Sequence, residues 1–130
     1  MEKKDDFFIS EELAEWMGLK KSEYLSELIQ NAGPNDIPLE QYHLFDQYIQ
    51  GTLENPDRTY ETIEDGNLVR TYLRTYQGSQ NFHQIVIGVV SEDPENKSKV
   101  FIPIMSFVSN DGNLVNGFCA GEVVTRPTLN

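Results

Sequence analysis

Two runs of β-branched and aromatic residues, 58–64 and 67–76, lie on either side of Asp65-Gly66. An Asp-Gly pair between two such runs is the strongest short-range signal for a β-hairpin, because both turn positions need positive φ angles. With a type I′ turn, the predicted cross-strand pairs are Ile63 with Leu68, Glu61 with Arg70 and Thr59 with Tyr72. This hairpin constrains the fold more than any other feature, since it fixes which side chains share a face.

Further strands are predicted beyond this hairpin. Residues 82–90, FHQIVIGVV, are apolar at both odd and even positions, which point to opposite faces of a strand. This is typical of a central strand covered on both faces. Residues 99–108 predict another strand, in which Pro103 indicates an edge position or a bulge. One or two short strands are expected after a turn at Asn110-Asp111-Gly112, at residues 113–118 and 122–126. The second half of the chain is therefore expected to be an antiparallel meander of four to six strands.

The first half has helical spacing instead. Ser10 as a cap and Gly18 as a stop predict a short helix, and Ser22 opens a second helix that ends near Gly33. A third helix is predicted over 38–53, because Pro38 fits its first position and the segment from Glu54 to Asp57 contains a proline that ends it. Its apolar residues recur at three- and four-residue spacing: Leu39, Tyr42, Phe45, Ile49 and Leu53.

Together these patterns predict an α+β fold in which about three N-terminal helices pack on a C-terminal antiparallel sheet. A chain of 130 residues is the usual size of one domain, and we expect residues 1–36 to be a helical extension of the unit formed by residues 37–130. The single Cys119 cannot form an internal disulfide, which favours a reducing compartment. No apolar run has the length of a signal peptide or a membrane span, so a cytoplasmic protein without membrane association is expected.

The formal net charge of −11 is confined to the first half of the chain. Residues 1–65 contain 16 acidic and 5 basic residues, whereas residues 66–130 contain 5 of each. The favoured interpretation is a solvated helical surface that keeps the protein soluble. The neutral second half leaves room for a local basic cluster that binds phosphate, although a uniformly acidic surface would repel nucleic acid.

The sequence lacks the signatures of metal and nucleotide chemistry. His43 and His83 lie in different predicted elements, with no carboxylate at metal-ligand spacing beside either. No glycine-rich phosphate loop is present. We therefore expect neither a metal nor a cofactor, and we expect Cys119 to be a packing residue rather than a nucleophile.

Strand 67–76 carries the main candidates for chemistry. Alternation places two arginines and two tyrosines on one face: Arg70, Tyr72, Arg74 and Tyr76. The alternative is an ordinary sheet surface, with one arginine bonded to Glu61 and the tyrosines as cross-strand partners.

His83 joins this group in only one of two registers. If the next turn is centred on Gly78-Ser79, Arg74 lies opposite His83, whereas a connection of odd length puts the histidine on the other face. In the first register the histidine can move a proton, the arginines can stabilise phosphate charge and the tyrosines can stack on a base.

From Ile37 onward the order of segments resembles a known group of domains. The segments are IPLEQYHLFDQYIQGTLENPDRTYE, a hairpin, NLVRTYLRTY, FHQIVIGVV and KVFIPIMSF. They resemble the nuclease-like domains of the barnase, EndoU, colicin and RelE group, often found in phage and mobile-element proteins. The resemblance implies a domain that binds or cleaves RNA without a metal. It places the catalytic residues on the sheet, at Arg70, Arg74, His83 and Ser106, with Tyr72 and Tyr76 binding the substrate.

Two other classes of function remain open. An acidic helical face is what a small immunity protein, antitoxin or secretion chaperone presents to a basic partner. Here that face carries Glu11, Glu12, Glu15, Glu23 and Glu27. The remaining class is a structural or assembly protein, for which an exposed edge at residues 99–108 can pair with another chain. The arrangement of Arg70, Arg74 and His83, in a cleft or dispersed, discriminates best among these classes.

Overall fold

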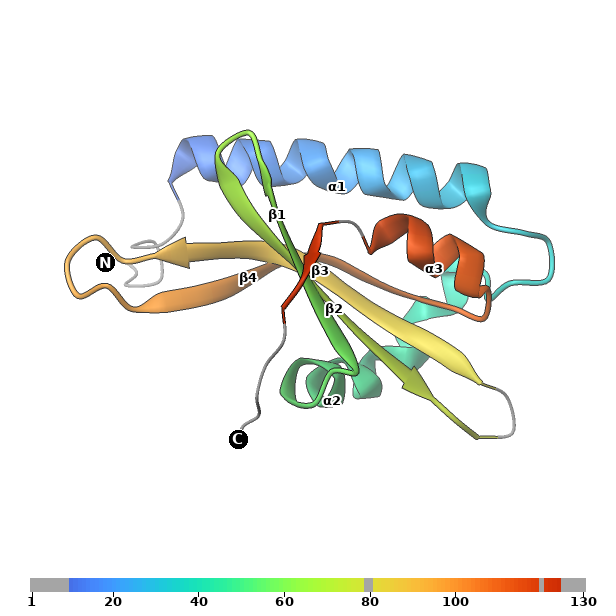
Figure 1. The fold of residues 1–130 in the computed structure, drawn as a ribbon. Helices are drawn as coiled ribbons and strands as arrows, with labels where there is room; N and C mark the ends of the chain where they lie inside the picture. The colour runs from blue at the N-terminus through green and yellow to red at the C-terminus, as the bar shows by residue number, and fades with distance from the viewer. Residues whose placement is uncertain (1–9, 79–80, 120, 125–130) are drawn as a thin grey trace.

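We describe residues 10–78, 81–119 and 121–124 of a computed structural model (Figure 1). The elements, in chain order, are α1 (Glu11–Asn31), the 3-10 helix η2 (Leu39–Tyr48), α2 (Ile49–Glu54), β1 (Arg58–Glu64), β2 (Asn67–Tyr76), β3 (Phe82–Glu92), β4 (Lys99–Ser109), α3 (Gly112–Phe118) and β5 (Glu122–Val123). Within these ranges the strands form one antiparallel sheet in the order β4-β3-β2-β1-β5. The predicted α+β class, with most helices before the sheet, is confirmed.

The β1–β2 hairpin has the predicted turn and register. Asp65 and Gly66 both have positive φ angles, 53° and 82°, as a type I′ turn requires. All three predicted cross-strand pairs are present: Ile63 with Leu68, Glu61 with Arg70 and Thr59 with Tyr72. The hairpin tip also reaches α1, because the indole nitrogen of Trp16 donates a hydrogen bond of 2.8 Å to Asp65.

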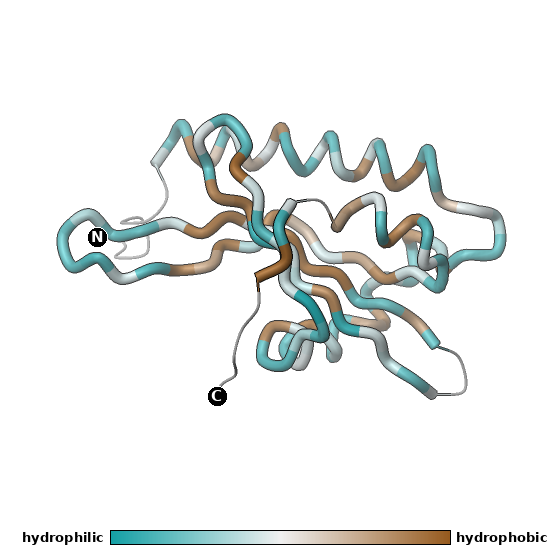
Figure 2. Tube along the Cα trace, in the orientation of Figure 1, coloured by the Kyte–Doolittle hydropathy of each residue, from teal (hydrophilic) through white to brown (hydrophobic). Residues whose placement is uncertain are grey.

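Strand β3 is covered on both faces, as its apolar sequence predicts. On the first face, which we call the α1 face, Ile85, Ile87 and Val89 pack with Leu28 of α1 and Phe118 of α3. The opposite face, which we call the η2 face, lies under η2 and α2 and includes the buried residues Gln84 and Val86 (Figure 1). Figure 2 shows that apolar residues are concentrated in the central strands.

Strand β4 is an edge strand and also contains a bulge, so the interpretation of Pro103 is confirmed. Met105 lies opposite Ile87 and Pro103 lies opposite Gly88, which leaves one extra residue in β4. The backbone of β3 at Gly88 lies so close to Phe101 of β4 that only a glycine fits. A Cβ atom at position 88 would lie 2.6 Å from the Phe101 ring.

The prediction of two short helices before residue 33 is wrong, because α1 runs without a break from Glu11 to Asn31. Gly18 is exposed, and a glycine inside a helix costs only about 1 kcal/mol relative to alanine. The apolar stripe continues past it from Met17 to Tyr24 and Leu28, and all three side chains pack on the core. Tertiary packing therefore outweighs the local stop signal. Ser10 caps this helix as predicted.

The predicted helix over 38–53 is in the right place but is α-helical only at its end. Four aromatic and apolar residues of η2 recur at intervals of three: Leu39, Tyr42, Phe45 and Tyr48. This spacing matches the three residues per turn of a 3-10 helix, so they lie in one line. The α-helical turn begins at Ile49, where the next apolar residue, Leu53, is four positions on. Phe45 packs on Phe82, with ring centroids 4.9 Å apart, whereas Leu39 is 42% exposed.

Residues 113–118 are helical, so the strand predicted there is wrong. Asp111 caps α3 by accepting a hydrogen bond of 2.9 Å from the backbone of Asn113. Leu114, Val115 and Phe118 then bury one side of the short helix. The strand predicted over 122–126 is confirmed for Glu122–Val123, and its last two residues lie outside the described ranges.

Two leucines of α1 provide a test of this packing. Leu28 is fully buried and Leu19 is 65% exposed. Leu28→Ala should lower the free energy of unfolding by about 2–5 kcal/mol, because it leaves a cavity in the core. Leu19→Ala should change it by less than about 0.5 kcal/mol. Urea denaturation of both variants measures the difference, and equal effects would contradict the orientation of α1.

Candidate functional site

The predicted arginine and tyrosine row lies on the η2 face. Strand β2 presents Arg70, Tyr72, Arg74 and Tyr76 on this face. Ser106 shares the face, because it lies opposite Val86, which in turn lies opposite Tyr72. Five of the six candidate residues are thus on one side of the sheet.

His83 is on the other side. It lies opposite Thr75 on the α1 face, and its Nδ1 atom is 2.8 Å from the Thr75 hydroxyl oxygen. Gln84 lies opposite Arg74 instead. The connection between β2 and β3 has an odd length, five residues, so the register that joins His83 to the arginines is wrong. The predicted Gly78-Ser79 turn includes a residue outside the described ranges.

Arg70 is held by neighbouring side chains of the sheet. Its Nε donates a hydrogen bond of 2.7 Å to Glu61, and another guanidinium nitrogen donates one of 3.1 Å to the Tyr72 hydroxyl. Burial alone would lower the pKa of Arg70, but its hydrogen bonds to Tyr72 and Glu61 raise it. A phosphate would have to compete with the Glu61 carboxylate for this guanidinium.

Arg74 and Tyr76 connect the sheet to α2. The Arg74 guanidinium lies 4.9 Å from the centre of the Tyr76 ring and donates a hydrogen bond of 3.3 Å to the Gly51 carbonyl. The Tyr76 hydroxyl donates a hydrogen bond of 3.0 Å to the Tyr48 carbonyl. These contacts hold the helical layer on the η2 face, which is a structural role.

The other candidates show no activated group. Burial raises the pKa of the Cys119 thiol to about 11, so the thiol stays protonated near neutral pH. His43 is exposed on η2. Within the described ranges, no three metal-ligating side chains cluster closely enough to hold a metal ion.

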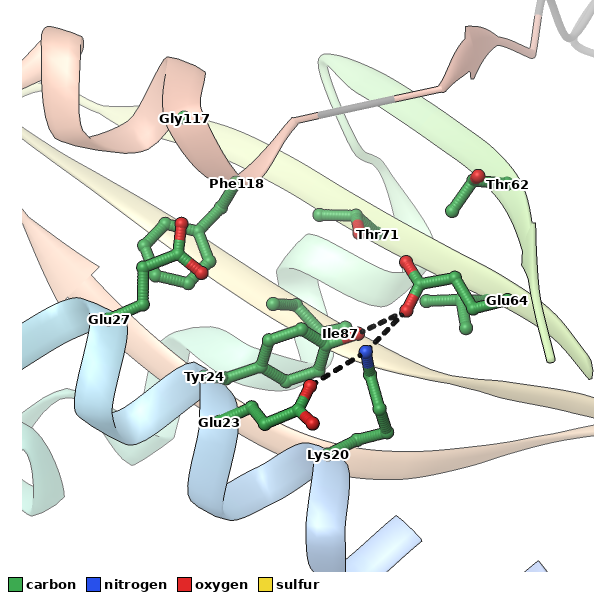
Figure 3. A pocket seen from close by; sticks show the side chains of 11 residues that line it. Lys20, Glu23, Tyr24, Glu27, Thr62, Glu64, Thr71, Ile87, Gly117 and Phe118 are labelled. Atoms are coloured by element: carbon green, nitrogen blue, oxygen red, sulfur yellow. Dashed lines mark hydrogen bonds and ion pairs between the residues drawn. The ribbon is translucent and has the colours of Figure 1, made fainter. Parts of the chain in front are cut away.

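A cavity that the sequence does not predict opens on the α1 face, between α1, α3 and the β1–β2 hairpin (Figure 3). It has a volume of about 230 Å³. Its lining residues are Lys20, Glu23, Tyr24, Glu27, Thr62, Glu64, Val69, Thr71, Ile87, Gly117 and Phe118. They come from segments far apart in the chain, so only the tertiary fold brings them together.

Lys20 is the centre of a polar network at this cavity. Its ammonium group is 2.7 Å from a Glu64 oxygen and 3.0 Å from a Glu23 oxygen (Figure 3). Burial would lower the pKa of Lys20, but its hydrogen bonds to Glu64 and Glu23 outweigh that effect and raise it. Burial, followed by the charge of Glu64, raises the pKa of Tyr24 to about 12. The lysine is therefore balanced by these carboxylates, and Glu27 adds a further negative charge.

Exposed carboxylates follow α1 along its length. Every fourth residue forms one stripe, which we call the α1 stripe: Glu11, Glu15, Leu19, Glu23 and Glu27. All five are exposed, as is Glu12, so the predicted acidic face is present. Because Lys20 is occupied with Glu23 and Glu64, the exposed basic residue of this helix is Lys21.

No known protein family, curated protein or solved structure matches this chain at a significant level. In the part of the chain that the structure describes, no helix is both long enough and apolar enough to cross a membrane.

The raised pKa values predict how stability depends on pH. The pKa of Cys119 is about 11, and burial raises those of Tyr24 and Tyr42 to about 12. In the unfolded chain the pKa values are lower, about 8.5 for cysteine and about 10 for tyrosine, so the unfolded chain loses these protons at lower pH. The free energy of unfolding should therefore fall as the pH rises from about 9 towards 12.

Urea denaturation at pH 7.5, 9 and 10.5 tests this expectation. Tyr42→Phe removes one of the groups and should show a smaller alkaline loss than the unsubstituted protein. A constant or rising free energy of unfolding over this range would contradict the assignment.

Proposed function

We propose that this protein is a binding module that presents the α1 stripe to a basic protein. The observation that carries the proposal is the stripe itself, in which four exposed glutamates flank a leucine that is 65% exposed. A partner of matching chemistry has lysine or arginine side chains around a small apolar spot. Such charge complementarity speeds encounter and selects the partner.

The charge of α1 supports this proposal. The helix has five glutamates against two lysines, and one of the lysines, Lys20, is paired with Glu23 and Glu64. The exposed side of the helix therefore keeps a net negative charge. Because α1 is packed on the core by buried Leu28 and by the contact of Trp16 with Asp65, the stripe is held on a rigid element.

The nuclease resemblance has less support from the geometry. A general acid or base must lie within hydrogen-bond reach of the reacting group. His83 is on the α1 face, whereas Arg70 and Arg74 are on the η2 face and already hydrogen-bonded to Glu61 and Gly51. RNA cleavage or binding by Arg70, Arg74, His83 and Ser106, with Tyr72 and Tyr76 on the bases, stays a rival proposal that the same protein sample can test.

Neutralising the stripe should weaken partner binding. The variant Glu11→Gln, Glu15→Gln, Glu23→Gln and Glu27→Gln removes four exposed carboxylates. Exposed ion pairs contribute roughly 0.2–1 kcal/mol each, so the affinity should fall about fivefold or more at low salt. The partner is captured from cell extract at low salt and identified, and its purified form is titrated at increasing salt concentrations.

A second quadruple variant is the matched control. Glu40→Gln, Asp46→Asn, Glu92→Gln and Glu95→Gln removes the same formal charge from exposed positions outside α1. It should bind nearly as well as the unsubstituted protein. Equal losses in both variants, or an affinity that ignores salt, would overturn the proposal. Cleavage of RNA in the presence of a chelator, lost in His83→Ala, would favour the nuclease instead.

A further inference from the structure

The cavity beneath Lys20 lies next to the α1 stripe and shares two residues with it. Glu23 and Glu27 belong to the stripe and also line the cavity. A partner that lies along α1 therefore has access to an opening between α1, α3 and the β1–β2 hairpin (Figure 3). At about 230 Å³, the cavity is smaller than the roughly 300–1,000 Å³ of usual small-molecule sites, so its size suits one side chain.

The floor of the cavity contains a polar group without a partner. Thr71 lines the cavity and is only 5% exposed. Among the described residues, no hydrogen bond is made by its hydroxyl. The fully enclosed unpaired side-chain atom in the described part of the chain is Gln84 Oε1, so the Thr71 hydroxyl is open to the cavity rather than sealed in the core. A ligand that enters the cavity can supply the missing donor.

The charges of the lining favour a cation. The cavity has three carboxylates, from Glu23, Glu27 and Glu64, against the single ammonium of Lys20. Glu23 and Glu64 are paired with that lysine, whereas the Glu27 carboxylate has no ion pair or hydrogen bond among the described residues. An anion would meet net repulsion here, and a cation would find Glu27 available.

We propose that this cavity receives one arginine side chain of the basic partner. The aromatic rings of Tyr24 and Phe118 both line it and lie edge to face, with centroids 6.4 Å apart. The Lys20 ammonium already lies 5.2 Å from the centre of the Tyr24 ring, so a guanidinium would pack on the Phe118 ring. Its five donors allow hydrogen bonds to the Glu27 carboxylate and the Thr71 hydroxyl. A lysine ammonium is more strongly hydrated and lacks the planar shape. The inference rests on the proposed function, because it names the side chain that the partner contributes.

The test uses the whole protein and a defined probe, N-acetyl-arginine amide. Titration followed by ¹⁵N–¹H NMR should give saturable shifts at Thr71, Gly117 and Phe118, with a Kd of about 1 mM for a ligand of this size. The neutral analogue N-acetyl-citrulline amide should not saturate the site. N-acetyl-lysine amide should bind at least about threefold more weakly.

Variants locate the site. Glu27→Gln should weaken probe binding about tenfold, because it removes a charged acceptor, and Thr71→Val should weaken it about threefold or more. Glu12→Gln removes an exposed carboxylate of α1 that does not line the cavity, so it should leave the Kd unchanged. Thermal melts show whether each variant is folded.

The outcomes separate this inference from the proposed function. Absence of saturable binding, or equal binding of the arginine and citrulline probes, overturns the cavity assignment even if the stripe variant still weakens the partner. Equal loss in Glu27→Gln and Glu12→Gln also overturns it, because the effect would then be general attraction. Probe binding that depends on Glu27 and Thr71 supports a guanidinium site in the cavity. If partner affinity then ignores the stripe variant, which also lacks the Glu27 carboxylate, the assignment of the partner's arginine to this site is overturned together with the proposed function.

Discussion

Burial of β3 on both faces is the constraint that arranges the rest of the molecule. A strand with apolar side chains at both parities needs a layer on each side, and one helix cannot supply both. In sequence order, α1 precedes the strands and covers one face of the sheet. The chain then crosses to the other face, where η2 and α2 lie (Figure 1). Asp36 fastens this crossing to the end of β4, by accepting hydrogen bonds of 2.5 Å from the Ser109 hydroxyl and 2.8 Å from the Asn110 backbone.

The β1–β2 hairpin gives the α1 face its particular chemistry. Its tip extends to α1, where Trp16 bonds to Asp65 and Lys20 bonds to Glu64. The helix is thus attached to the hairpin by polar contacts near its first half and to the core by Leu28 near its end. The space between these attachments is filled neither by α3 nor by the hairpin, and it remains as the cavity.

Local chemistry made the sheet predictable. The Asp65-Gly66 turn, the two-sided apolar run of β3 and the bulge at Pro103 each follow from interactions within a few residues or one strand pair. The shared face of Arg70, Tyr72, Arg74 and Tyr76 was predictable for the same reason, because alternate residues of a strand point to the same side. The continuity of α1 through Gly18 was not, because it depends on packing against residues more than 40 positions away. The helix over residues 113–118 was missed although its signals are local, because Asp111 caps it and the buried Leu114, Val115 and Phe118 have helical spacing.

The functional candidates divide in the same way. The face of the sheet on which His83 lies depends on whether the loop between β2 and β3 has an odd or even length, and the sequence alone allows either. The acidic face of α1 was evident because its residues are local to one helix. The cavity was not, because Lys20, Glu64 and Thr71 come together only in the folded chain. Once α1 is known to be continuous, however, the i, i+4 spacing of Lys20 and Tyr24 is a signal that both face the hairpin.

The long 3-10 helix has a consequence for motion. A 3-10 helix has poorer hydrogen-bond geometry than an α-helix, and runs of more than a few residues are uncommon. None of the residues of η2 is buried, whereas α1 has the buried Leu28, so we expect η2 to open at a lower free energy than α1. Its amide hydrogens should exchange with solvent before those of α1. Each opening would separate Phe45 and Tyr48 from Phe82 and bring water to the buried side-chain carbonyl of Gln84, which has no hydrogen-bond partner among the described residues.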